Sequence, residues 1–71
     1  MKKLINELLE MVEEGYEEAI IAWDKNFSNI SVNLLEDKKA IPEEYIIGTL
    51  DLSIYNSYDD IKEEIESMLE D

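Results

Sequence analysis

The chain has 71 residues, of which 19 are Asp or Glu and 6 are Lys, with no Arg, His or Cys, so its formal charge is −13. This length and a hydrophobic fraction of 45% predict one small acidic domain over residues 1–71, and exclude a multidomain enzyme and a disordered acidic tail. The absence of His and Cys removes imidazole bases, thiol nucleophiles and ordinary zinc sites. We therefore expect a protein that is not an enzyme and that holds no cofactor or metal.

The first predicted element is an amphipathic helix that starts near Leu4. Its apolar residues follow one another in steps of one, three and four, which favours a single helix to about Trp23. Gly15 leaves an alternative open, because a helical Gly costs about 1 kcal/mol relative to Ala and Gly also ends helices. In that alternative residues 17–24 form a strand, although residues 19–22 lack the polar alternation of a half-buried strand.

Two strands are predicted in the middle of the chain. Residues 30–34 alternate apolar and polar side chains with the two-residue period of a strand that has one wet face. After a charged connection, Pro42 holds the residue before it extended, and the alternation resumes in a longer strand over residues 45–55. Gly48 in this strand indicates a bulge, a close backbone approach or an ordinary edge position.

The last predicted element is a helix from about Tyr58 to Leu69. Ser57 can cap its free amides, and Asp59 and Asp60 lie in its first turn, where the helix dipole favours negative charge. The order helix, two or three antiparallel strands, helix predicts an α+β fold with both helices packed on one sheet face. A two-stranded sheet is marginal, so a third strand or a homodimer joined at sheet edges would help, and a monomer and a homodimer both stay open.

The negative charge is concentrated toward the two ends of the chain. Residues 1–24 have a formal charge of −5, residues 25–56 of −2 and residues 57–71 of −6. Many acids in the predicted helices are four residues apart, and this repulsion costs about 1 to 3 kcal/mol at low salt. Strong charge keeps a small protein soluble and monomeric, which explains an acidic surface but not a nearly unpaired one.

A more specific explanation of the unpaired acidic surface is that its carboxylates occupy the positions of nucleic-acid phosphates on a basic partner protein. Six Glu between residues 7 and 18 would form a dense negative ridge on one helix, similar electrostatically to a nucleic-acid surface. A basic protein partner that binds nucleic acid would then be blocked, whereas direct binding to nucleic acid or to a membrane is disfavoured. The residues expected to bind the partner are Glu7, Glu10, Glu13, Glu14, Glu17, Glu18, Asp59, Asp60, Glu63 and Glu64.

In size, charge and lack of catalytic residues, the chain is similar to small acidic inhibitors of phages and mobile elements, including anti-restriction and anti-CRISPR proteins. The likeness is one of class and covers no residue-by-residue correspondence. It implies a noncatalytic inhibitor that mimics nucleic acid.

The N-terminal segment already has an acid at Glu7, and the chain has no apolar run of transmembrane length, so we expect a cytoplasmic protein.

A second kind of interaction module is also consistent with the sequence. In this alternative, an immunity-type or antitoxin-type protein binds through a sheet edge and its aromatic residues, and charge only tunes the association rate. The expected contacts are Tyr45, Ile47 and Tyr55, while Trp23 and Phe27 flank the first predicted turn. Binding of this kind should persist at high salt, whereas binding through an acidic ridge should weaken steeply.

One short segment has part of a calcium-loop pattern. Asp24, Asn26 and Ser28 have the alternating oxygen spacing that opens such a loop. Asn29 stands in place of the usual glycine, and Leu35 stands where the acid at the twelfth position belongs. We therefore expect no calcium site in this segment.

Overall fold

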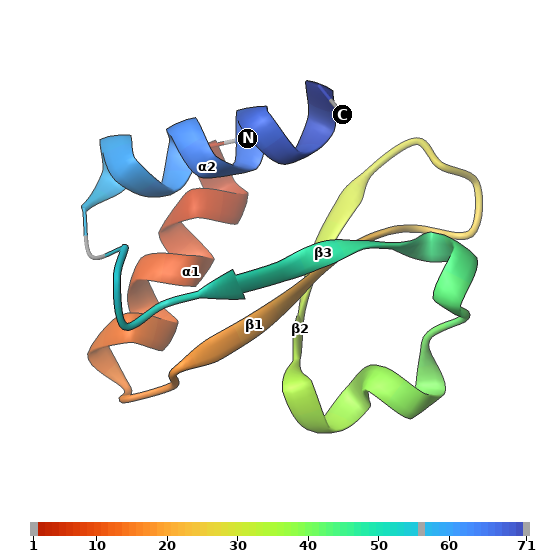
Figure 1. Cartoon of the computed structure of the whole chain (residues 1–71), viewed down its shortest axis with the longest axis horizontal. Coiled ribbons are helices and arrows are strands. Elements are labelled where there is room, and N and C mark those ends of the chain that lie inside the picture. The colour runs from red at the N-terminus through yellow and green to blue at the C-terminus, as the bar shows by residue number, and fades with distance from the viewer. Residues whose placement is uncertain (1, 56, 71) are drawn as a thin grey trace.

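The computed structural model describes residues 2–55 and 57–70, which form two helices and a three-stranded sheet (Figure 1). The elements in chain order are α1 (Lys2–Glu13), β1 (Glu18–Trp23), β2 (Ile30–Leu34), the 3-10 helices η1 (Leu35–Ala40) and η2 (Glu43–Tyr45), β3 (Ile46–Asp51) and α2 (Tyr58–Glu70). The strands are antiparallel and lie in the order β2, β1, β3. This confirms the predicted α+β fold, with three strands in the sheet.

The hydrophobic core lies between the two helices and one face of the sheet. α1 contacts β2, α2 contacts β3, and the helices contact each other, so together they cover this face. Among the described residues no polar or charged side chain is buried. The buried residues of this core are Leu4, Ile5, Leu8, Ala19, Ile21, Leu50, Leu52, Ile61 and Ile65.

α1 ends just before Gly15, so the favoured prediction of one helix to Trp23 is wrong. Gly15 has a φ of 93°, which lies in the left-handed region. Its N–H donates to the Val12 carbonyl at 3.1 Å, and the Tyr16 N–H donates to the Met11 carbonyl at 3.0 Å. These two bonds and the left-handed Gly form a Schellman motif, which ends the helix and turns the chain toward β1. The alternative prediction of a strand after Gly15 is confirmed.

β1 is the central strand and is covered on both of its faces. Ala19 and Ile21 point toward the helices, whereas Ile20 and Ala22 point to the opposite face, where η1 contacts β1. All four side chains are at most 1% exposed. A strand covered on both faces is apolar throughout, so the missing alternation did not exclude a strand here.

β3 is shorter than the strand predicted over residues 45–55. The Asp51 carboxylate accepts hydrogen bonds from the backbone N–H of Ser53 at 3.0 Å and from its hydroxyl at 2.6 Å. A side-chain acceptor of this kind stabilises a turn and ends the strand. Ile54 continues the apolar alternation but is 64% exposed, so the predicted C-terminal part of the strand is wrong.

Gly48 marks both a bulge and a close approach. Gly48 and Ile46 pair with consecutive residues of β1, which leaves Ile47 as the extra residue of a bulge. A Cβ atom on Gly48 would lie 3.3 Å from Cε of Met68 in α2. The missing side chain therefore lets α2 lie close to β3.

β2 has its predicted bounds, and α2 agrees with its prediction to within one residue. The Ser57 hydroxyl accepts a hydrogen bond from the Asp60 N–H at 3.3 Å, and the Ser57 carbonyl accepts one from the Ile61 N–H at 3.1 Å. These bonds confirm Ser57 as the N-terminal cap of α2. The turn residue predicted at position 56 lies outside the described residues.

The conformation of Gly15 gives a test of the fold. Gly15→Ala should lower the free energy of unfolding by about 1 kcal/mol, because a left-handed backbone is unfavourable for an L side chain. No atom lies within 4 Å of the Cβ position, so the loss would not come from a clash. Gly15→Asn should cost less, since Asn tolerates this conformation. Urea unfolding measures both, and an Ala variant as stable as the wild type would contradict the Schellman turn.

Candidate functional site

The six glutamates predicted to form one helical ridge fall on both sides of the end of α1. Glu7, Glu10 and Glu13 lie on α1, while Glu14, Glu17 and Glu18 lie in the turn after it and at the start of β1. All six side chains are exposed. The continuous ridge is therefore wrong, because Gly15 ends the helix that was to carry it. α1 itself holds two lysines and three glutamates, a formal charge of only −1.

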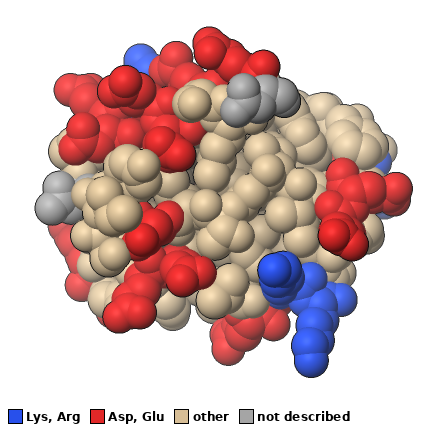
Figure 2. Space-filling model, in the orientation of Figure 1, with Lys and Arg blue, Asp and Glu red and all other residues tan. Residues whose placement is uncertain are grey.

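α2 is the acidic element of the structure. It holds six acids and one lysine within 13 residues, a formal charge of −5. Figure 2 shows acidic side chains gathered densely where Figure 1 places this helix. Four exposed acids at helical spacing line one shallow surface of α2 together with Lys62 and Ser67. We call the four acids the α2 stripe: Asp59, Glu63, Glu66 and Glu70.

The α2 stripe differs in part from the predicted set. It contains Asp59 and Glu63, which were predicted, and Glu66 and Glu70, which were not. Glu66 follows Glu63 by three residues and Glu70 follows Glu66 by four, and this helical spacing was the signal that could have found them. The complete stripe could therefore have been predicted from the sequence, once the helix itself was predicted.

Asp60 and Glu64 lie on another side of α2 and contribute to local structure. The backbone N–H of Asp60 takes part in the helix cap at Ser57. The half-buried Glu64 carboxylate accepts a hydrogen bond from the Tyr55 hydroxyl at 3.0 Å. This bond, followed by burial and by the negative charge of Glu64, raises the pKa of Tyr55. Tyr55, predicted as a partner contact, therefore points toward α2.

The segment that has part of a calcium-loop pattern is a hairpin loop closed by its own aspartate. The Asp24 carboxylate accepts hydrogen bonds from the Asn26 N–H at 2.9 Å, the Ser28 N–H at 3.0 Å and the Ser28 hydroxyl at 3.0 Å. The bond from the Ser28 N–H is the main cause of a lowered pKa of Asp24. Within residues 2–55 and 57–70, no group of three or more acids is placed to hold a metal ion.

The same loop presents an exposed aromatic ring beside an apolar groove. Phe27 is 53% exposed and has a φ of 58°, a left-handed conformation that is rare for bulky residues. Its ring meets the ring of Tyr45 edge-on, with 5.1 Å between centroids. We call the neighbouring hollow the Phe27 groove, and its apolar lining is Trp23, Phe27, Ile46, Ile47, Met68 and Leu69, with the single acid Glu44.

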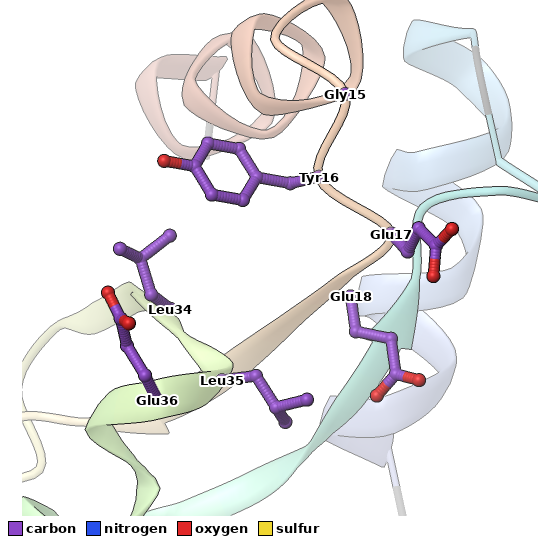
Figure 3. A pocket seen from close by; sticks show the side chains of 7 residues that line it. All are labelled: Gly15, Tyr16, Glu17, Glu18, Leu34, Leu35 and Glu36. Atoms are coloured by element: carbon purple, nitrogen blue, oxygen red, sulfur yellow. The ribbon is translucent and has the colours of Figure 1, made fainter.

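A smaller hollow of about 340 Å³ lies between the turn after α1 and the end of β2 (Figure 3). We call it the Tyr16 hollow. Its apolar sides are Tyr16, Leu34 and Leu35, and its acids are Glu17, Glu18 and Glu36. Two predicted partner-binding residues, Glu17 and Glu18, thus lie beside exposed apolar side chains that the charge pattern had not indicated.

No protein-family model, curated protein sequence or solved structure matches the chain. None of the helices in the described part of the chain is long and apolar enough to cross a membrane. Among the described residues only apolar side chains are buried, so the candidate functional groups lie on the surface. These groups are the α2 stripe, the Phe27 groove and the Tyr16 hollow.

The hydrogen bond between Tyr55 and Glu64 predicts a pH dependence. The folded-state pKa of Tyr55 is raised above its ordinary value of 10.0, so folding favours the protonated hydroxyl. Its contribution to stability is complete below that ordinary value and is lost as the pH rises through the folded-state pKa. Tyr55→Phe should therefore lower stability at neutral pH and reduce the further loss in alkali.

Chemical denaturation at neutral pH and at about pH 11 measures this difference. Tyr58→Phe is the control, because Tyr58, the first residue of α2, is another half-buried tyrosine. The interpretation fails if Tyr55→Phe and wild type lose the same free energy of unfolding between the two pH values.

Proposed function

We propose that the protein is a noncatalytic inhibitor that mimics nucleic acid, with the α2 stripe occupying a basic, nucleic-acid-binding surface of a partner protein. The exposed stripe carries the proposal. From Asp59 to Glu70 the helix rises about 16 Å, so its four carboxylates are about 5.5 Å apart along the axis. Phosphates on one DNA strand are about 3.4 Å apart, so the stripe is a sparser line of the same sign.

The uneven distribution of charge supports a role in binding. Solubility requires net charge, yet α2 has a formal charge of −5 and α1 only −1. Like-charge pairs four residues apart on α2, such as Glu66 with Glu70, each cost a few tenths of a kcal/mol. The last turn of α2 has no basic residue to interact favourably with the helix dipole. Beyond its first turn, this concentration of charge works against the stability of α2.

A partner groove lined by Lys and Arg would gain electrostatic steering and counterion release by binding α2. While bound, the protein would block the partner from DNA or RNA. This mode of action fits the class of small acidic anti-defence proteins from phages and mobile elements, and it places the protein in the cytoplasm with its partner.

Charge reversal on the α2 stripe tests the proposal. The triple variant Glu63→Lys, Glu66→Lys and Glu70→Lys should abolish capture of a nucleic-acid-binding protein from a bacterial lysate, because it turns the charge of α2 positive. The wild type should release that partner with rising salt and with competing duplex DNA. Mass spectrometry identifies the protein that is captured.

The matched control reverses three exposed acids that lie outside α2 and outside both hollows, through Glu13→Lys, Asp37→Lys and Glu43→Lys. It changes the net charge equally and should retain most of the binding. Circular dichroism verifies that both variants are folded. Equal capture by the two triple variants would contradict a specific role of α2.

The Phe27 groove supports a second candidate function, an interaction module of immunity or antitoxin type. Phe27 is exposed in a conformation that costs about 1 kcal/mol, and aromatic residues beside apolar hollows often dominate interfaces. The groove includes side chains of β3, which is an edge strand of the sheet. Ile47, a predicted contact, lines it, and Tyr45 packs on Phe27.

Phe27→Asn tests this second function. Asn is compatible with the left-handed backbone, so the variant should stay folded while it loses a partner that wild type holds at high salt. The control is Ile54→Asn, which removes an apolar side chain that is 64% exposed and does not line the groove. Retention of the salt-resistant partner by Phe27→Asn would rule out the groove as the main contact.

A further inference from the structure

The Tyr16 hollow brings together exposed apolar side chains from distant parts of the sequence. Tyr16, Phe27, Leu35 and Ile54 are the large apolar residues that the structure leaves exposed in its described part. Two of them, Tyr16 at 42% and Leu35 at 45% exposed, line the same hollow. Single exposed apolar residues are normal on a surface, but two that meet at a hollow form a candidate contact site.

The fold holds this hollow open from two sides. The Schellman turn at Gly15 places Tyr16 outside the helix, with its N–H fixed to the Met11 carbonyl at 3.0 Å. The pairing of Ala19 with Leu34 fixes the end of β2 beside the start of β1, and Leu35 follows as the first residue of η1. Both sides of the hollow are therefore fixed in position by backbone hydrogen bonds.

The charges around the hollow are all of one sign. In Figure 3 the Tyr16 ring faces Leu34, and the Glu36 carboxylate lies beside Leu34. The Glu18 side chain lies on the other side, near Leu35, while the Glu17 carboxylate points away from Tyr16. No lysine is among the residues that line it. The complementary occupant is a cation attached to an apolar or planar stem.

Arginine meets this requirement better than lysine. Its planar guanidinium can stack on a tyrosine ring and still donate hydrogen bonds to carboxylates in its own plane. Its aliphatic stem can lie on leucine side chains. A volume of about 340 Å³ is at the lower end for ligand sites, which suits a single side chain.

We infer that the Tyr16 hollow binds an arginine side chain of a partner protein, with the stem against Leu34 and Leu35, the guanidinium against Tyr16, and the charge balanced by Glu18 and Glu36. The hollow and the α2 stripe share no lining residue. The inference is therefore independent of the proposed role of α2, and either can fail without the other.

An NMR titration of the ¹⁵N-labelled protein tests the inference directly. The probe is Nα-acetyl-arginine amide, and the control is the citrulline analogue, which has nearly the same shape but no charge. Arginine should produce saturable shifts at the amides of Tyr16, Glu18 and Leu35, and citrulline should not. Absence of saturation there, or equal shifts along α2, would overturn the inference. Equal affinity for Nα-acetyl-lysine amide would overturn the preference for arginine.

Matched variants separate the contributions of ring and charge. Tyr16→Ala and Glu36→Gln should each weaken arginine binding by about two- to fivefold, the effect of losing an exposed cation–π or charge contact. Ile54→Ala and Glu43→Gln make comparable changes at exposed positions away from the hollow and should leave the affinity unchanged. Spectra that keep their dispersion verify the fold, and equal losses in test and control variants would overturn the assignment.

Discussion

The left-handed backbone at Gly15 is the constraint on which the rest of the structure depends. It ends α1 and frees the apolar run of residues 19–22 to become the central strand of the sheet. β2 and β3 both pair with β1 and not with each other, so without β1 there would be no sheet for the helices to cover. The same turn places Tyr16 beside the end of β2. The turn at Gly15 therefore positions both the central strand of the sheet and the Tyr16 side of the Tyr16 hollow.

Local patterns predicted the elements that local interactions control. β2 alternates apolar and polar residues along its sequence, and α2 has an apolar stripe with a capping Ser57 before it. β1 could not be assigned in this way, because an apolar run is typical of a central strand and also continues a helical stripe. The decision depends on segments that pair with β1 from elsewhere in the chain. The end of β3 depends instead on a single side chain, that of Asp51.

The candidate sites also differ in how far they could be predicted, because some depend on local spacing and others on contacts between distant segments. The α2 stripe follows from helical spacing alone, so its members can be read from the sequence once the helix is known. The grouping of Glu17 and Glu18 with Glu36 cannot, because it follows from the pairing of β1 with β2. The Phe27 groove likewise combines the hairpin loop, β3 and the end of α2. The charge pattern therefore predicts a positively charged partner but does not predict the shape of the surface that would bind it.

Charge and apolar surface would act at different stages of binding. The field of α2 extends about 8 to 10 Å at ordinary ionic strength, so it would raise the rate of encounter with the proposed basic partner. The lifetime of a complex depends more on desolvated apolar contacts at its centre. Both apolar hollows include at least one carboxylate, Glu44 in the Phe27 groove and three in the Tyr16 hollow. A partner side chain with an apolar stem and a positive end would match both hollows. The carboxylates that attract a basic protein would therefore also determine which of its side chains bind in the hollows.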